Sequence, residues 1–208
     1  MKIAILGATG NVGTRLVNEA LQRGHQVTAL ARSAESLPAR AGLTAKNIDV
    51  SHADALSQAF AGHDAVISSL KFLGTDPRLI IDAVKRVGDN APRLLVVGGA
   101  GSLFGAPGVQ IVDTPDFPEA YKAEALAGRQ LLNTLEAEPA DSTLDWTFLS
   151  PSALLLPGER TGKFRLGQDD LLVDGAGKSA ISIEDYAVAM LDEVETPRHT
   201  RRRFTVGY

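Results

Sequence analysis

The chain has 208 residues, a formal net charge of −4 and no cysteine, and 44% of its residues are hydrophobic. This length suits one full domain and is short for two, so we expect a single domain over residues 1–208. The absence of cysteine excludes disulfides, thiolate metal sites and cysteine nucleophiles, and the four histidines are too scattered for a metal site. The mild negative charge gives no reason to expect nucleic acid or a membrane as partner.

The chain begins with a strand-length apolar run that a glycine interrupts, which fits neither a signal peptide nor a membrane span. We therefore expect a cytoplasmic protein with a small molecule as its partner, present as a monomer or a small homo-oligomer. Near the other end, the basic run of residues 198–203 is interpreted as solvated surface, as most such runs are.

Short apolar runs alternate with helical patterns up to residue 150. We expect strands at 2–6, 26–31, 47–50, 64–70, 93–99 and 145–150, and helices at 12–23, 53–60, 77–87 and 118–136. Asp76-Pro77 is typical of a helix start, and Ser51-x-x-Asp54 is a second candidate cap. This alternation predicts an α/β fold, a doubly wound parallel sheet of the Rossmann type, with strand order 3-2-1-4-5-6.

After Pro151 the pattern changes to loops, two short strand-like pieces, KFRLG and DLLVD, and one helix from about Ser182. We interpret residues 151–208 as most of a small C-terminal lobe on the substrate side. Such a lobe would cover the carboxyl edge of the sheet, where doubly wound folds bind their ligands.

The first strand runs into GATGNVG, residues 7–13. In a dinucleotide-binding turn, Gly7 would allow the tight bend, Gly10 would let the backbone approach the pyrophosphate, and Gly13 would let the helix pack closely. The helix start would offer free N–H groups to the phosphates. Because the motif lies between a predicted strand and a predicted helix, we favour phosphate binding over a purely structural turn. The other cofactor contacts expected here are Thr9, Asn11 and Val12.

The end of the second strand carries Arg32, where NAD-specific folds usually have an acidic residue for the ribose. A guanidinium at this position would attract the 2′-phosphate of NADP, so we favour NADPH over NADH. Asp49 and Val50 are placed to line the adenine pocket, although Asp49 fits a simple loop cap equally well. Ser69 and Leu70, at the end of the fourth strand, are also assigned to the cofactor site.

Several segments of the chain resemble the atypical short-chain dehydrogenase/reductases. They are GATGNVG, VTALAR, NIDVSHADAL, DAVISSL and VVGGAGSLF, then WTFLSPSALLLPGERTGKFRLG and ISIEDYAVAMLDEV. Within that group the chain is most similar to the NADH-flavin reductases with an NAD(P)H-binding Rossmann fold, relatives of the flavin/biliverdin-IXβ reductases. The likeness covers nearly the whole chain.

The wider superfamily uses a Tyr-x-x-x-Lys pair for acid/base catalysis, and this chain departs from it. Tyr121 is followed directly by Lys122, with Ala125 at the fourth position. Tyr186 has Met190 at the fourth position. Residues four apart share a helix face whereas neighbours diverge, so Lys122 is badly placed to assist Tyr121 in proton transfer. The missing pair counts against sugar-nucleotide epimerases and ordinary ketone reductases.

Flavin reduction does not need that pair, because the ring tolerates negative charge and solvent can protonate it. The resemblance thus implies reduction of a flavin or similar conjugated acceptor by direct hydride transfer, with the flavin as substrate rather than bound prosthetic group. It points to Ser102 as an orienting hydroxyl near the nicotinamide, with an ordinary turn serine as an equal alternative. Tyr121 is the other candidate catalytic residue.

Four residues at strand ends are assigned to the nicotinamide side of the cofactor site. Gly98 and Gly99 would let the cofactor approach the end of the fifth strand, and Ser150 and Pro151 would flank the nicotinamide after the sixth. We assign Gly98 and Gly99 because they have no side chain to block the cofactor, and Ser150 and Pro151 because they lie at the end of a strand.

Arg160, in GERTG, is the one candidate for the substrate side. Its guanidinium would meet an anionic ring or a phosphate of the substrate, and an ion pair with Glu159 or Asp169 is the alternative. Ser182-x-x-Asp185 has the form of a capping box and receives no catalytic role.

Two functions remain open from the sequence. The leading one is an NADPH-dependent reductase, and the other is a non-enzymatic NADP(H)-binding redox sensor of the nitrogen-metabolite-repression type. The absent Tyr-x-x-x-Lys pair suits both. The lack of a long insertion for a partner protein favours the enzyme.

Overall fold

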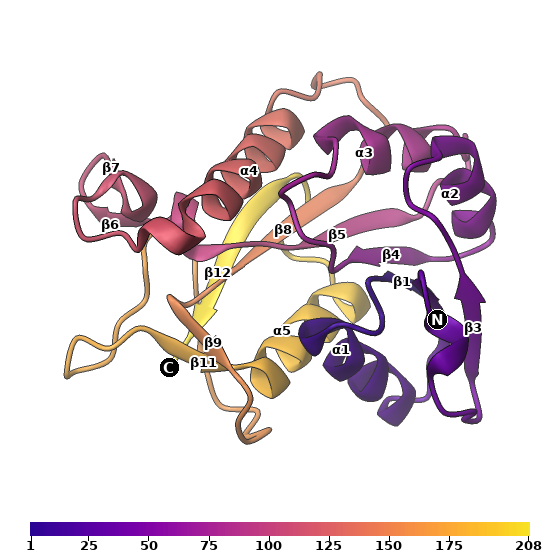
Figure 1. Cartoon of the computed structure of the whole chain (residues 1–208), viewed down its shortest axis with the longest axis horizontal. Helices are drawn as coiled ribbons and strands as arrows, with labels where there is room; N and C mark the ends of the chain where they lie inside the picture. Colours follow the sequence, from indigo (N-terminus) through magenta and orange to yellow (C-terminus); the bar gives the residue numbers. More distant parts are fainter.

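The computed structural model describes the whole chain, residues 1–208, and its centre is one eight-stranded sheet (Figure 1). Seven strands are parallel, and only the edge strand β10 runs antiparallel, to β12. From one edge to the other the strands are β10 (Arg165–Gly167), β12 (Arg202–Gly207), β8 (Trp146–Pro151), β5 (Arg93–Val97), β4 (Ala65–Ser68), β1 (Lys2–Leu6), β2 (Gln26–Ala31) and β3 (Leu43–Asn47).

Helices cover both faces of the sheet (Figure 1). One face packs on α1 (Asn11–Gln22) and α5 (Ile183–Glu195), and the other on α2 (Ala53–Phe60), α3 (Pro77–Lys85) and α4 (Glu119–Glu136). The central strands are therefore buried on both sides, which is why they read as continuous apolar runs rather than as alternation. The predicted doubly wound fold and the order 3-2-1-4-5-6 are confirmed, with β8 as the sixth strand.

The register brings the carboxyl ends of the strands to one edge of the sheet. Leu6, the last residue of β1, lies beside Leu30 of β2 and Ser68 of β4. The loops that follow these strands meet there, together with the 3-10 segment η2 (Ala100–Ser102) after β5. In doubly wound folds this edge holds the ligand.

Two local predictions need correction. The third strand is β3, residues 43–47 rather than 47–50, because it is a half-exposed edge strand whose polar sequence LTAKN carries no apolar run. The predicted cap at Ser51 is also wrong, since α2 begins after His52 without any side-chain cap. The cap at Asp76 is confirmed, because its carboxylate accepts a hydrogen bond from the N–H of Arg78 at 2.9 Å.

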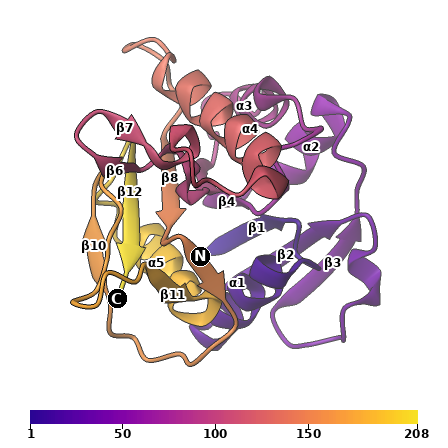
Figure 2. The ribbon, with the colours of Figure 1, turned by 60° about the vertical axis from the view of Figure 1, so that its left-hand side comes forward.

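The C-terminal lobe is smaller than predicted. Residues 183–208 form α5 and β12, which belong to the main body, since α5 packs beside α1 and β12 pairs with β8 (Figure 2). Of the intervening stretch, β10 also joins the main sheet, and the parallel pair β9 (Leu154–Leu156) and β11 (Ala180–Ser182) forms a separate layer. The piece DLLVD is not a strand, because it makes only a single bridge, from Asp170 to Phe104.

The segment between β5 and α4 holds structure that the sequence did not predict. A short hairpin of β6 (Phe104–Ala106) and β7 (Val109–Gln110) follows η2 and leads into a second 3-10 segment, η3 (Ile111–Asp113). A third one, η1 (Ala34–Ser36), follows β2. No helix combines the length and the apolar composition that a membrane crossing requires.

The basic run at 198–203 is not simply solvated surface, as its residues lead into β12. Arg203 is buried, and its guanidinium contacts Asp169 and Ser102. The alternation in this strand places Phe204 and Val206 in the core below the sheet, so the opposite face carries Arg203.

A fully buried carboxylate, that of Asp185, connects the GERTG loop, α5 and the C-terminus. It accepts hydrogen bonds from the Thr161 hydroxyl at 2.6 Å, the Gly162 N–H at 2.8 Å and the Tyr208 hydroxyl at 2.9 Å. Its own N–H donates to Ser182 Oγ, which confirms the predicted cap. These contacts explain why GERTG and ISIEDYA carry such particular sequences.

We therefore expect Asp185→Ala to lower the free energy of unfolding by about 2–4 kcal/mol, because three partly buried hydrogen bonds to a buried charged acceptor are lost. Asp185→Asn should cost less, since the hydroxyls of Thr161 and Tyr208 can rotate to accept from an amide. Thermal unfolding of both variants measures this, with the exposed Asp141→Ala as control. A loss in Asp185→Ala no larger than in the control would contradict the account.

Candidate functional site

In the turn after β1, Gly7 and Gly13 leave no room for a side chain. Gly7 has φ +73°, and a Cβ there would lie 2.5 Å from the Ser69 carbonyl oxygen. A Cβ on Gly13 would lie 2.1 Å from the Gly7 carbonyl oxygen, so α1 touches the turn backbone to backbone. Gly10 differs, because a Cβ there would meet only the Gly7 oxygen, at 3.3 Å. Its missing side chain leaves space toward the outside.

The start of α1 is free to bind an anion. The helix begins after Gly10 with no side-chain cap and no acidic residue in its first turn. The backbone N–H groups of Asn11, Val12 and Gly13 donate to no acceptor in the protein. Free N–H groups at the positive end of a helix dipole form a natural phosphate site.

This turn opens into a large cavity at the carboxyl edge, with a volume of about 830 Å³. Its walls come from the glycine turn, the end of β2, the loop after β3 and the loop after β4. The lining residues predicted from the sequence are Gly7, Thr9, Gly10, Arg32, Asp49, Val50, Ser69 and Leu70.

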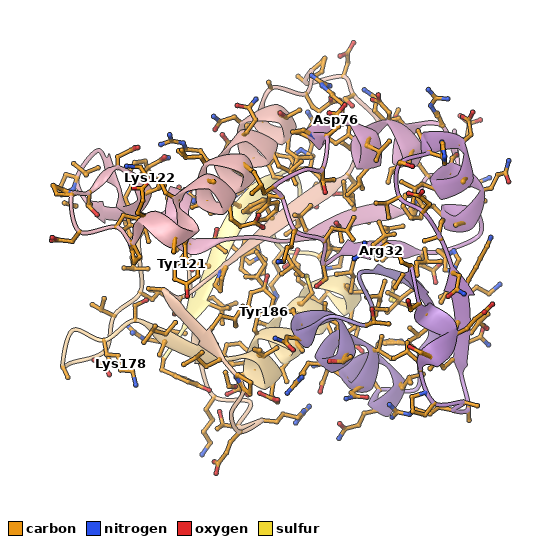
Figure 3. The ribbon with its side chains drawn as sticks, in the orientation of Figure 1. Arg32, Asp76, Tyr121, Lys122, Lys178 and Tyr186 are labelled. Atoms are coloured by element: carbon orange, nitrogen blue, oxygen red, sulfur yellow. The ribbon has the colours of Figure 1, made fainter.

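Two of the charged residues that line this cavity are Arg32, which follows β2, and Asp49, which follows β3. Arg32 is exposed and forms neither an ion pair nor a hydrogen bond within the protein, so its guanidinium is available to a ligand (Figure 3). Asp49 accepts a hydrogen bond from the Ser51 N–H at 2.9 Å. This bond lowers the pKa of Asp49 below its usual value, and the positive charge of Arg32 contributes a smaller effect in the same direction. Asp49 is thus both a loop cap and a lining residue.

The second cavity, of about 500 Å³, lies between η2, the start of α4 and the C-terminal lobe. Half of its lining residues are hydrophobic. The lining includes three residues predicted from the sequence, Gly99, Ser102 and Tyr121. Phe72, Phe117 and Leu154 supply much of the apolar wall. Apolar cavities with a few polar groups are typical of sites for small organic ligands.

The loop after β4 forms the boundary between the two cavities, since Lys71 and Leu73 line the larger and Phe72 the smaller. Glu124 on α4 fixes this loop, because its carboxylate accepts from the N–H groups of Phe72 and Leu73 at 2.8 and 2.9 Å. Gly128 leaves room for the Phe72 ring, which a Cβ would approach to 2.8 Å. The two cavities are therefore neighbours across one anchored segment.

Ser102 is nearly buried at the base of the smaller cavity and is held by Arg203. The guanidinium donates from Nη1 to the Ser102 carbonyl at 3.0 Å and to its hydroxyl oxygen at 3.2 Å. The other guanidinium nitrogens donate to Asp169, at 2.8 and 2.7 Å. Because Ser102 Oγ already accepts from a cation, its own proton is left to donate toward a ligand.

No tyrosine–lysine pair forms at the site. Tyr121 is exposed at the smaller cavity, and Figure 3 shows Lys122 on the other side of the first turn of α4. Tyr186 is buried, and its hydroxyl donates to the Leu149 carbonyl at 2.6 Å. Burial raises the pKa of Tyr186 far above its usual value, so this phenol does not exchange protons with a ligand.

Several predicted site residues line neither cavity. Arg160 forms a bidentate pair with Glu19 of α1, at 2.7 and 2.8 Å, and not with a substrate group, Glu159 or Asp169. Gly98 is required by packing, since a Cβ would lie 2.4 Å from the Phe148 ring. Ser150 and Pro151 belong to the buried end of β8.

The sequence missed two residues that shape the smaller cavity. Arg203 was hidden in a basic run, although the alternation of Phe204 and Val206 after it is a strand signal. Phe72 lies in a loop two residues before Gly74, and no local pattern distinguishes it from a surface aromatic. Its stacking on Phe148, with ring centroids 6.3 Å apart, appears only in the folded chain.

Comparisons with known proteins agree with this geometry. The model of a family described as NAD(P)H-binding matches residues 7–196. The chain therefore belongs to this NAD(P)H-binding family of atypical, short-chain dehydrogenase/reductase-like oxidoreductases, as its sequence motifs indicated. NAD(P)H is a dinucleotide, and the glycine turn, its free N–H groups and the adjoining cavity are suited to bind one.

Two curated proteins are similar to the chain over very different lengths. The uncharacterized protein YwnB of Bacillus subtilis is 39% identical, covering 99% of this chain and 98% of its own. L-arabinose 1-dehydrogenase (NAD(P)+) of Haloferax volcanii is 44% identical over only 66 residues, which are 32% of this chain and 24% of that enzyme. The second likeness is thus confined to one part of the fold.

Solved structures extend the comparison. A "putative epimerase" of Bacteroides thetaiotaomicron is 45% identical with a TM-score of 0.92, covering 100% of this chain and 96% of its own. A "putative NADH-flavin reductase" of Streptococcus pneumoniae is 33% identical with a TM-score of 0.85, covering 100% and 99%. A short-chain dehydrogenase/reductase of Veillonella parvula in complex with NADP shares the fold. It is 20% identical with a TM-score of 0.78, covering 100% of this chain and 94% of its own.

Substitutions at Gly10 and Gly13 are predicted to cause different defects. Gly10→Val should fold but weaken NAD(P)H binding by about tenfold or more, because its side chain enters the space left open at the helix start. Gly13→Val should fail to reach the native fold, since its Cβ would overlap the Gly7 carbonyl. Circular dichroism and quenching or enhancement of nicotinamide fluorescence measure the two effects. Unchanged cofactor affinity in a folded Gly10→Val variant would contradict the assignment.

Proposed function

We propose that this protein is an NADPH-dependent reductase that reduces a flavin, or a similar conjugated acceptor, by direct hydride transfer. The observation that carries the proposal is the pair of neighbouring cavities, one built on the glycine turn and the other apolar with Ser102 at its base. The name of the Streptococcus pneumoniae relative supports the choice of a flavin. A flavin would be a substrate here and not a permanently bound group.

The residues of the larger cavity would hold the cofactor. The free N–H groups at the start of α1 suit its pyrophosphate, and Arg32 suits the extra phosphate of NADPH, since no carboxylate occupies the end of β2. Asp49 and Val50 are placed for the adenosine. When bound, the cofactor supplies a hydride and leaves oxidised, and a solvent proton completes the two-electron reduction of the acceptor.

The residues of the smaller cavity would position the acceptor. The Ser102 hydroxyl, held by Arg203, is directed to donate a hydrogen bond to a carbonyl or ring nitrogen. Phe72 and Phe117 exclude water and offer flat apolar surface. No protein group needs to transfer a proton, which agrees with the unpaired Tyr121 and the buried Tyr186.

The Bacteroides relative is named as an epimerase, and we considered that reaction for this chain. Epimerisation at carbon needs a group that removes and returns a proton. Ser102 accepts from a guanidinium, Tyr186 is buried, and Tyr121 has no lysine partner on its own helix face. Reduction places no such demand on these residues, so we prefer it.

The test is oxidation of NADPH by the purified protein with and without riboflavin, and with a quinone as a second acceptor. Acceptor-dependent oxidation well above the background without protein supports the proposal. Tight NADPH binding without turnover of any acceptor would contradict it and favour the redox-sensor function.

The proposed preference for NADPH rests on Arg32. Arg32→Ala should weaken NADPH binding by about 1–3 kcal/mol, the size of a charged hydrogen bond, and leave NADH binding nearly unchanged. Arg202→Ala is the matched control, because Arg202 is also exposed and lies at the amino end of β12, away from the cleft. Titration calorimetry with both cofactors measures this. Equal losses for NADPH and NADH would show that Arg32 does not contact the phosphate.

The proposed roles at the acceptor site predict modest kinetic effects. Ser102→Ala should lower the turnover rate several-fold, corresponding to about 1 kcal/mol, because an orienting hydrogen bond is lost. Tyr121→Phe should lower the rate by far less than the 10²–10⁴-fold that is typical of a lost general acid. Steady-state NADPH oxidation at saturating acceptor decides this. A collapse of activity in Tyr121→Phe with cofactor binding intact would identify Tyr121 as a proton donor.

A further inference from the structure

The two cavities differ in the charged groups that they offer to a ligand. In the larger one, the charged lining residues are Arg32, Lys71, Asp49 and Asp76. Both carboxylates accept from backbone N–H groups, whereas the two cations form no ion pair within the protein and are free to meet a phosphate. In the smaller one, the charged lining residues are Asp116, Glu124 and Arg129. The cationic groups suited to bind a phosphate therefore line the larger cavity and not the smaller one, which lies across the loop after β4.

The only cation lining the smaller cavity is already neutralised. Arg129 donates to the Asp113 carboxylate at 2.7 Å and to the Gln110 side-chain oxygen at 3.0 Å. Arg203, behind Ser102, is likewise paired with Asp169. A phosphate in this cavity would have to break one of these pairs to gain a partner of opposite charge.

The acidic residues at the cavity also oppose an anion. Both oxygens of the Glu124 side chain accept from the N–H groups of Phe72 and Leu73, so this residue offers no donor to an anion. Asp116 is exposed, lines the cavity and has no ion-pair or hydrogen-bond partner. The start of α4, which would otherwise attract an anion, carries Glu119 in its first turn and Asp116 just before it.

We infer that the smaller cavity selects uncharged planar acceptors, such as riboflavin or a simple quinone, over phosphorylated ones such as FMN, and that Asp116 determines this specificity. The inference rests on the proposed function for the identity of the cavity as the acceptor site. Repulsion between the free Asp116 carboxylate and a phosphate dianion raises the free energy of the phosphorylated complex, while the apolar wall binds both rings alike.

The experiment compares the dissociation constants of riboflavin and FMN, which share one ring and side chain and differ by the terminal phosphate. Each is titrated, by quenching of flavin fluorescence, into the protein saturated with NADP+, so that no turnover occurs. Riboflavin should bind about tenfold or more tightly than FMN. 1,4-Naphthoquinone and 1,4-naphthoquinone-2-sulfonate, titrated by calorimetry, repeat the comparison with a smaller planar ring.

Asp116→Lys should reduce the FMN-to-riboflavin ratio of dissociation constants by roughly five- to tenfold, because repulsion of the phosphate becomes attraction. Asp89→Lys is the matched control. It makes the same charge change on an exposed residue just before β5, at the amino edge of the sheet, and should leave the ratio unchanged.

Three results would overturn the inference: FMN binding as tightly as riboflavin, an equal change of the ratio in both variants, or failure of both uncharged compounds to bind. These results are read from binding alone. They are therefore distinguishable from failure of the proposed reductase function, which shows itself as absence of NADPH oxidation.

Discussion

The contact between the start of α1 and the end of β1 constrains the rest of the molecule. Gly13 lies against the Gly7 carbonyl so closely that no side chain fits between them. This contact sets the position of α1 against the sheet and leaves the first N–H groups of the helix without acceptors at the carboxyl edge. Unpaired N–H groups destabilise the folded state unless water or an anionic ligand reaches them. One packing constraint therefore determines both the position of α1 and the candidate cofactor site.

The second constraint is the loop after β4, which forms a common wall of both cavities. Glu124 holds its backbone from α4, while Phe72 stacks on Phe148 in the core. In the proposed reductase, an anchored boundary of this kind would fix the distance between a cofactor in one cavity and an acceptor in the other. Positioning of the two reactants is the catalytic contribution that a hydride transfer without a protein acid requires.

The sequence predicts the parts of this account that depend on local pattern. The buried central strands, the turn at Gly7 and the cap at Asp76 all follow from apolar runs, glycine spacing or capping residues near one another in the chain. The parts it misses depend on partners distant in sequence. Arg203 contacts Ser102 across 101 positions, and Arg160 contacts Glu19 across 141, so no local pattern reveals either pair. The predicted position of the edge strand β3 was wrong because an exposed edge strand needs no apolar run that would reveal it in the sequence.

In the proposed reaction, the two cavities bring a reduced nicotinamide and an acceptor into direct contact. The decisive measurement is rapid mixing of the NADPH-loaded protein with riboflavin under anaerobic conditions. For direct hydride transfer, we expect the absorbance of the reduced nicotinamide and that of the oxidised flavin to fall with the same rate constant, and this rate constant should decrease when the transferred hydrogen is deuterium. Persistence of the reduced cofactor beside a bound flavin would contradict it.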